Sequence, residues 1–201
     1  MVAVGSMIIV YFQHTCGMFR ICSYRIKRAV HINLLENIKQ KKGNLILKGI
    51  ISAVDIHRQT LTLCRLLESN FEVMLICLIL IAVISLSLNL FRIFQIASSK
   101  DDIKDILFPF AFVTINILYM FIANYLAQDL TDHNNDIFTT VYNVQWNAAP
   151  LHIQKMILFL LQRGSKDFTI SVGGLFVGSL ECFATMVRAS VSYFTVMYST
   201  Q

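Results

Sequence analysis

Charged side chains are scarce in this sequence, and their scarcity shows which solvent the chain is built for. Lys, Arg, Asp and Glu make up 14% of its 201 residues, whereas hydrophobic residues make up 56%. A soluble domain carries about 25% charged residues. Only two prolines are present, so long helices can run without interruption. This composition is typical of a helical membrane protein.

Motifs of catalysis and metal binding are also missing. The sequence contains no glycine-rich phosphate loop, no nucleophile elbow and no paired carboxylates in a plausible cleft. Its five cysteines, at positions 16, 22, 64, 77 and 182, have no metal-binding spacing. We therefore expect no enzyme, no metal site and no cofactor.

Long stretches of the chain lack charge altogether. Residues 73–91 and 106–128 carry none, and residues 168–201 carry only Glu181 and Arg188. Each is long enough to cross a hydrocarbon core of about 30 Å. A fourth uncharged stretch, 2–19, contains the polar residues Gln13 and His14. We predict an all-α membrane protein with four spans.

The basic residues predict the orientation of these spans. Residues 20–69 hold ten of the seventeen Lys and Arg residues against three acidic ones. Because cytoplasmic loops carry the excess of basic residues, this segment is predicted to be cytoplasmic and the C-terminus extracellular. A basic loop beside anionic membrane lipid explains the net charge of +5 better than binding to nucleic acid does.

The same reasoning divides the whole chain into predicted segments. They are a first span 1–22, a cytoplasmic loop and helix extension 23–70, a second span 72–96, an outer loop 97–105, a third span 106–128, a cytoplasmic region 129–167 with a short helix 151–163, and a final span 168–198. The absence of proline between Leu45 and Phe94 predicts one long helix, whose first half has an apolar stripe that includes Ile51 and Val54.

The final span carries a polar stripe. At 100° per residue, six polar residues fall within about 80° of arc: Glu181, Thr185, Arg188, Ser192, Thr195 and Ser199. A charge at the membrane centre costs about 2.5 to 3.5 kcal/mol, so Glu181 and Arg188 are not expected to face lipid. Two alternatives remain open: the stripe packs against neighbouring helices, or it lines a hydrated pore formed by several subunits.

Several segments together resemble the insect odorant receptor family. They are "QHTCGMF" at 13–19, "SLSLNLFR" at 85–92, "NYLAQDL" at 124–130, "VYNVQW" at 141–146, "LQRGSKDFTISVGG" at 161–174 and the ending "SYFTVMYSTQ". The likeness covers nearly the whole chain in order, and the ending is most similar to receptors of ants, bees and wasps.

This resemblance implies a fold and a function. Family members have an inverted topology of seven transmembrane helices with a cytoplasmic N-terminus, and the last helix is split into a cytoplasmic and a pore-lining half. The chain then corresponds to the C-terminal part, and Met1 to an internal start. The family implies an olfactory receptor of the sensory-neuron plasma membrane, which binds small volatile apolar odorants and acts as a ligand-gated cation channel with a shared odorant co-receptor in a hetero-tetramer.

The resemblance also assigns residues. The polar stripe is expected to line the pore, and Val196 matches a valine that narrows it. Part of the odorant pocket is expected at Ile8, Phe108, Phe110 and Phe112. Trp146, Met156 and Leu160 are expected to anchor subunits to one another. Alternatives are a non-functional truncated receptor fragment and a polytopic transporter or scaffold protein.

Overall fold

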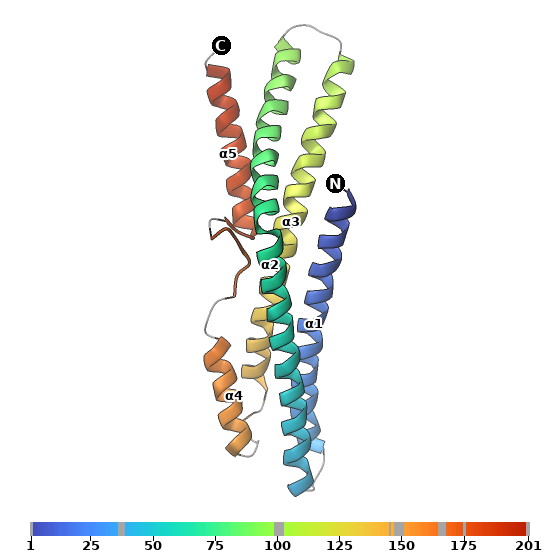
Figure 1. The fold of residues 1–201 in the computed structure, drawn as a ribbon, viewed down its shortest axis with the longest axis vertical. Helices are drawn as coiled ribbons and strands as arrows, with labels where there is room; N and C mark the ends of the chain where they lie inside the picture. The colour runs from blue at the N-terminus through green and yellow to red at the C-terminus, as the bar shows by residue number, and fades with distance from the viewer. Residues whose placement is uncertain are drawn as a thin grey trace. The chain divides into compact units, whose positions relative to one another are not determined.

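The computed structural model consists almost entirely of helices. It describes residues 2–35, 39–98, 103–144, 146, 151–164, 168–174 and 176–199. In chain order the elements are α1 (Val2–Leu35), α2 (Lys39–Ser98), α3 (Ile103–Asn143), α4 (Leu151–Gly164), β1 (Ser171–Val172), β2 (Phe176–Val177) and α5 (Leu180–Ser199) (Figure 1). The expectation of an all-α fold is therefore met except for one short hairpin.

Two helices are long and apolar enough to cross a membrane, by length and composition, among the described residues. They lie within α2, at Leu47–Ser98, and within α3, at Lys104–Asn143. α2 runs through 60 residues without a break, which confirms the long helix predicted over 45–94. The spans predicted at 1–22 and 168–198 stay predictions.

The segments predicted as cytoplasmic loops are largely helical. α1 continues to Leu35, α2 already begins at Lys39, and α3 extends to Asn143. A reason lies in the sequence: no proline occurs in residues 23–70 or 129–149, and the apolar residues there are buried when the helices extend and pack.

The last helix begins later than the predicted residue 168. β1 and β2 pair antiparallel, with Ser171 opposite Val177, and α5 starts only at Leu180. Gly173 and Gly174 have φ angles of 65° and 64°, a left-handed conformation that glycine adopts without strain. The Ser179 hydroxyl oxygen then accepts a hydrogen bond from the Cys182 amide at 3.1 Å and caps α5.

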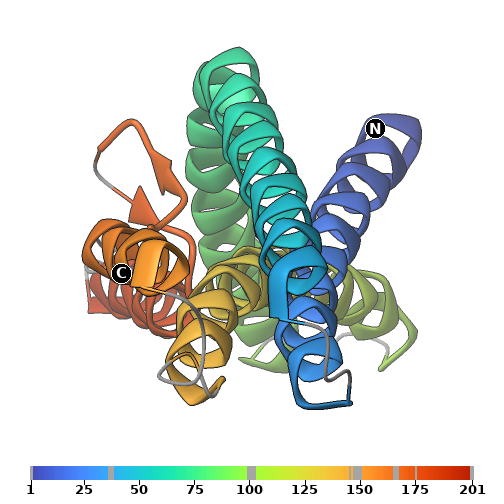
Figure 2. The ribbon, with the colours of Figure 1, turned by 90° about the horizontal axis from the view of Figure 1, so that it is seen from below.

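The chain divides into two compact units. The first comprises residues 1–67 and 129–170 and contains α1, the first part of α2, the last part of α3, and α4 (Figure 2). Its core includes Phe19 of α1, Ile50 and Ala53 of α2, Leu130 of α3 and Ile153 of α4. All four helical segments of this unit therefore share one apolar core.

The second unit comprises residues 68–128 and 171–201. Its core is smaller and consists of Leu86 of α2, Val113 and Met120 of α3, and Met186 of α5. Partly buried apolar residues of all three helices surround these four side chains. The core thus fixes which face of α5 turns towards α2 and α3.

Within the first unit, α1 and α2 approach closely at a pair of small residues. A Cβ atom added at Gly49 would lie 2.8 Å from the Cβ of Ala29, closer than real Cβ contacts allow. The atom in the way is the methyl carbon of Ala29, which cannot rotate aside as the end of a long side chain could. Small residues at helix contacts permit such approaches.

We therefore expect Gly49→Ala to destabilise the first unit. Overpacking costs typically about 1–3 kcal/mol, which exceeds the gain of about 1 kcal/mol in helix propensity. Thermal unfolding of the purified chain, followed by circular dichroism, measures the change. Gly17→Ala is the control, since nothing lies within 4 Å of a Cβ added there. Equal or higher stability of Gly49→Ala than of Gly17→Ala would contradict the close approach.

In the second unit, α2 holds the hairpin through Glu68. Its Oε1 atom accepts hydrogen bonds from the Ser171 backbone amide at 3.0 Å and from the Ser171 hydroxyl at 2.9 Å. A Cβ added at Gly173 would lie 2.8 Å from Cδ1 of Ile76, which also belongs to α2. The hairpin that precedes α5 is thus attached to α2 by polar bonds and by close packing.

We expect Glu68→Ala to loosen the hairpin. Hydrogen bonds to a charged group contribute about 1.5–3 kcal/mol, so amide hydrogen exchange at Ser171 should accelerate by tenfold or more. Exchange measured by mass spectrometry over residues 168–177 checks this. Glu68→Gln keeps one acceptor oxygen and should have the smaller effect; identical exchange in wild type and both variants would show that Glu68 does not hold the hairpin.

Candidate functional site

The polar stripe of α5 lies on an exposed face of the helix. Its six polar members, Glu181, Thr185, Arg188, Ser192, Thr195 and Ser199, are all exposed, and Val196 beside them is 56% exposed. Met186 and Ser190 of α5 are buried instead. The structure brings all seven predicted pore residues together on this face, whereas their role in a pore stays a prediction.

Hydroxyl groups on this face donate to the backbone of their own helix. Thr185 Oγ1 donates to the Glu181 carbonyl at 3.0 Å, and Thr195 Oγ1 donates to the Ser192 carbonyl at 2.7 Å. Ser199 Oγ likewise donates to the Val196 carbonyl at 2.9 Å. A hydroxyl has one hydrogen and two lone pairs, so each group keeps acceptor capacity for water or a cation.

The two charges on the face differ in position and sign. Glu181 lies in the first turn of α5. Arg188 follows seven residues later, which is about 10 Å along the helix axis. A carboxylate at a helix N-terminus is favoured by the helix dipole. The face therefore changes from negative at the start of α5 to positive near its middle.

A second set of polar residues, which the sequence analysis missed, packs α5 against α2. Ser190 is buried, and its backbone carbonyl accepts a hydrogen bond from Ser87 Oγ at 3.1 Å. Ser87 itself is 3% exposed. In the sequence, the two serines of "SLSLNL" at 85–90 were the signal that could have indicated this polar contact. Hydroxyl packing between helices thus occurs in this unit, but on the side of α5 that carries Ser190 and away from the exposed stripe.

The predicted odorant-binding residues belong to two different units, and their role in a pocket stays a prediction. Phe108, Phe110 and Phe112 are exposed near the start of α3 and are 67%, 59% and 49% accessible. The rings of Phe108 and Phe112 lie 5.0 Å apart between centroids. Ile8 is half-buried on α1 in the first unit, whereas the phenylalanines belong to the second.

The predicted anchor residues pack within their own chain. Trp146, Met156 and Leu160 are partly buried against the core of the first unit. The exposed apolar residues of α4 are Leu151, Leu158 and Phe159. The role of Trp146, Met156 and Leu160 in contacts between subunits stays a prediction.

One group of potential metal ligands was not expected from the sequence. Ligand atoms of Cys16 on α1 and of Asp129 and His133 on α3 lie within 4.8 Å of one another. His133 Nδ1 lies 2.7 Å from the Asp129 carbonyl oxygen, and Arg20 Nε donates to His133 Nε2 at 2.6 Å. Both ring nitrogens of His133 thus already make hydrogen bonds within the chain, and the positively charged Arg20 lies beside the ring. Both observations disfavour binding of a metal ion here.

Comparison with known proteins assigns the chain to a family. Residues 1–191 match the family described as 7tm Odorant receptor. Odorant receptor 22c of Drosophila melanogaster is 22% identical over 187 residues, which cover 92% of this chain and 45% of that receptor. Odorant receptor 10 of Aedes albopictus is 23% identical over 148 residues, which cover 74% of this chain and 38% of that receptor.

Odorant receptor 9a of Drosophila melanogaster is 19% identical over 196 residues, which cover 98% of this chain and 46% of that receptor. The chain therefore spans less than half the length of these relatives. The particular likeness to receptors of ants, bees and wasps stays a prediction. Because the match extends over most of the sequence, the chain belongs to the insect odorant receptor family, whose members are membrane receptors of olfaction and not enzymes.

Proposed function

We propose that the full-length protein containing this chain is an odorant-gated cation channel subunit in the plasma membrane of olfactory sensory neurons. It assembles with the shared odorant co-receptor into a hetero-tetramer around one pore. Binding of a small volatile apolar ligand opens that pore. Membership in the odorant receptor family over residues 1–191 supports this function.

The exposed polar face of α5 carries the proposal. Glu181 and Arg188 are exposed, although the rest of α5 is largely apolar. Contact of either charge with lipid would cost about 2.5 to 3.5 kcal/mol at the membrane centre. Assembly of several subunits with this face turned inwards gives both charges access to water, so a hydrated pore explains the pattern physically.

Each residue of the face then has a role. Glu181 attracts cations at one end of the helix, and the hydroxyl oxygens of Thr185, Ser192 and Thr195 offer acceptors to water around a passing ion. Val196 forms an apolar narrowing that closes by dewetting. Arg188 opposes cation entry and is offset by Glu181.

The remaining assignments follow the same topology. Segments 23–70 and 129–167 are cytoplasmic and the C-terminus is extracellular, in agreement with the basic residues of 20–69. The four helical spans of the chain form part of an inverted seven-helix receptor. Phe108, Phe110 and Phe112, with Ile8, supply part of the odorant pocket, and α4 contributes to contacts between subunits.

We expect neutralising the two charges to change cation current in opposite directions. A unit charge about 4 Å from an ion contributes about 1 kcal/mol in water, or about fivefold in local ion concentration. Glu181→Gln should therefore lower single-channel conductance and Arg188→Gln should raise it. Recordings from cells that express the full-length protein with the co-receptor measure both. Conductance unchanged in both variants, or no odorant-evoked current at all, would overturn the proposal.

We also expect cysteines on the polar face to react with water-soluble reagents. Thr185→Cys, Ser192→Cys and Thr195→Cys, in a background without the exposed Cys77 and the half-buried Cys182, should be modified by charged methanethiosulfonates and lose most of their current. Ser190→Cys is the buried control and Tyr193→Cys the exposed control off the stripe. Modification of the two controls with protection of the stripe would reject the pore wall.

A further inference from the structure

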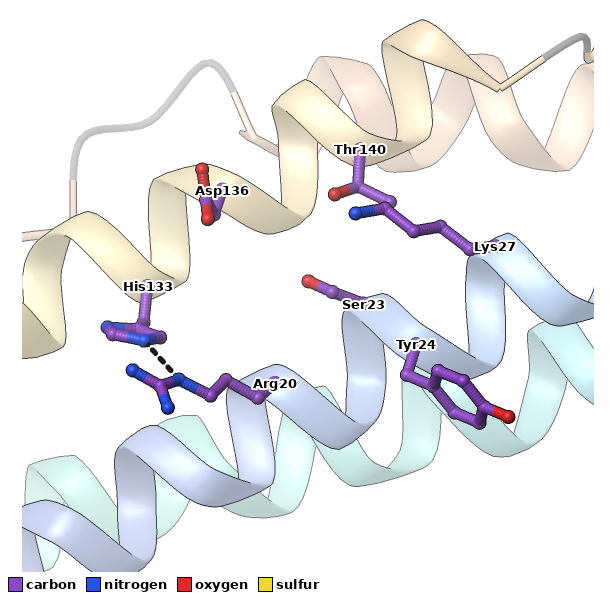
Figure 3. Close-up of a pocket in the computed structure, with 7 residues that line it drawn as sticks. All are labelled: Arg20, Ser23, Tyr24, Lys27, His133, Asp136 and Thr140. Carbon is purple, nitrogen blue, oxygen red and sulfur yellow. Dashed lines mark hydrogen bonds between the residues drawn. The ribbon is translucent and has the colours of Figure 1, made fainter.

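A polar groove lies between α1 and α3 in the first unit. Its volume is about 350 Å³, and its walls include Arg20, Ser23 and Lys27 of α1 and His133, Asp136 and Thr140 of α3 (Figure 3). Pockets that bind small molecules commonly have volumes of about 300 Å³ or more. None of the residues that line the groove belongs to α5 or to the residues assigned above to the pore and the odorant pocket.

Hydrogen-bond donors dominate the groove. Figure 3 shows Arg20 opposite His133 at one end, Lys27 reaching towards Thr140 at the other, and Ser23 between them. Arg20 and Lys27 are seven residues apart on α1, which places their Cα atoms about 10 Å apart along the axis. Two permanent cations and two hydroxyl groups therefore surround the same space.

The side of the groove formed by α1 carries positive charge and no negative charge. Residues 1–35 contain no Asp or Glu, whereas Arg20, Arg25, Lys27 and Arg28 follow one another within nine residues. Arg25 donates to Ser52 of α2 at 2.6 Å and so serves a different contact. Arg20 is held by its Nε bond to His133, which uses one of the three guanidinium nitrogens. The cationic wall is thus partly preorganised.

Among the described residues, the acidic side chain that lines the groove is Asp136, and the carboxylate of Asp129 lies 3.3 Å from His133 Nδ1 beyond the lining. Asp136, Arg20 and Lys27 are all exposed, so solvent weakens the interactions among these three charges. Arg20, Lys27 and Asp136 together give the lining a net charge of +1. An anion with several acceptor oxygens matches these donors better than a cation or an apolar molecule does.

We propose that this groove binds a phosphate group between Arg20 and Lys27, with Ser23 and Thr140 as further donors. Segments 23–70 and 129–167 are proposed to be cytoplasmic, which would bring the groove to the basic side of the membrane, where anionic lipid head groups gather. A free phosphate compound offers the same chemistry, and the experiment separates the two sources. The proposal does not depend on a channel activity.

The test measures binding to the purified 201-residue chain in phosphatidylcholine nanodiscs. One arm adds a phosphatidylinositol bisphosphate at a few per cent of the lipid, and the other adds inorganic phosphate. Lys27→Gln and Arg20→Gln should each weaken binding by about fivefold. Arg28→Gln is the matched control, since it removes a cation of α1 that does not line the groove, and it should change affinity less than twofold.

Asp136→Asn makes the test independent of folding defects. Removing this carboxylate should tighten binding about twofold or more, and a damaged fold cannot produce such a gain. Binding of the lipid alone would support a head-group site, and binding in both arms would support a site for any phosphate. Binding in neither arm, an equal loss in Arg28→Gln and Lys27→Gln, or no gain in Asp136→Asn would overturn the proposal.

Discussion

Polar side chains in apolar helices must find their hydrogen-bond partners inside the protein, and this requirement shapes the whole chain. Thr15, Thr60, Asn124 and Ser190 each donate to the backbone carbonyl four residues earlier, and the Ser87 hydroxyl shares its one hydrogen between the carbonyls of Val83 and Ser190. Among the residues that the structure describes, no buried side-chain nitrogen or oxygen lacks a partner. Without water in the hydrocarbon core, each unmade bond would cost several kcal/mol.

This requirement separates two kinds of polar residue in the helices. A serine or threonine satisfies its single hydrogen on its own helix, so its presence in a span needs no functional reason. A full charge is different, because bonds to one helix do not replace its hydration. Glu181 and Arg188 are exposed on the same face of α5. The position of these two charges therefore indicates a function more strongly than the hydroxyl groups around them do.

The sequence predicted those features that depend on residues close together in the chain. The helical fold and the long α2 followed from few prolines and from apolar length. A separate short helix before the last span was also predicted, although α5 begins at Leu180 and not at residue 168. The polar stripe of α5 also lies on one face, because helix periodicity alone determines it. The family was identified from short segments spread along the chain, and residues 1–191 confirm it.

Features that depend on which helices meet could not be predicted in this way. The groove, the bond from Ser87 to Ser190 and the cluster of Cys16 with Asp129 each join helices distant in sequence. The apolar stripe of α2 was predicted only in part: Val54 packs against the core, but Ile51 is 45% exposed, whereas Ile50 and Ala53 are buried. Contact with Ala29 at Gly49 sets which side of α2 faces inwards, and periodicity does not contain that information.

The hairpin between α4 and α5 has a mechanical consequence. A continuous helix would transmit twist along its axis through successive backbone hydrogen bonds, whereas residues 171–177 interrupt that ladder with a turn at two left-handed glycines. The helical backbone of α5 is therefore not continuous with that of α4. Because the carboxylate of Glu68 holds the hairpin that leads into α5, a displacement of α2 at this residue would move the start of α5 with it.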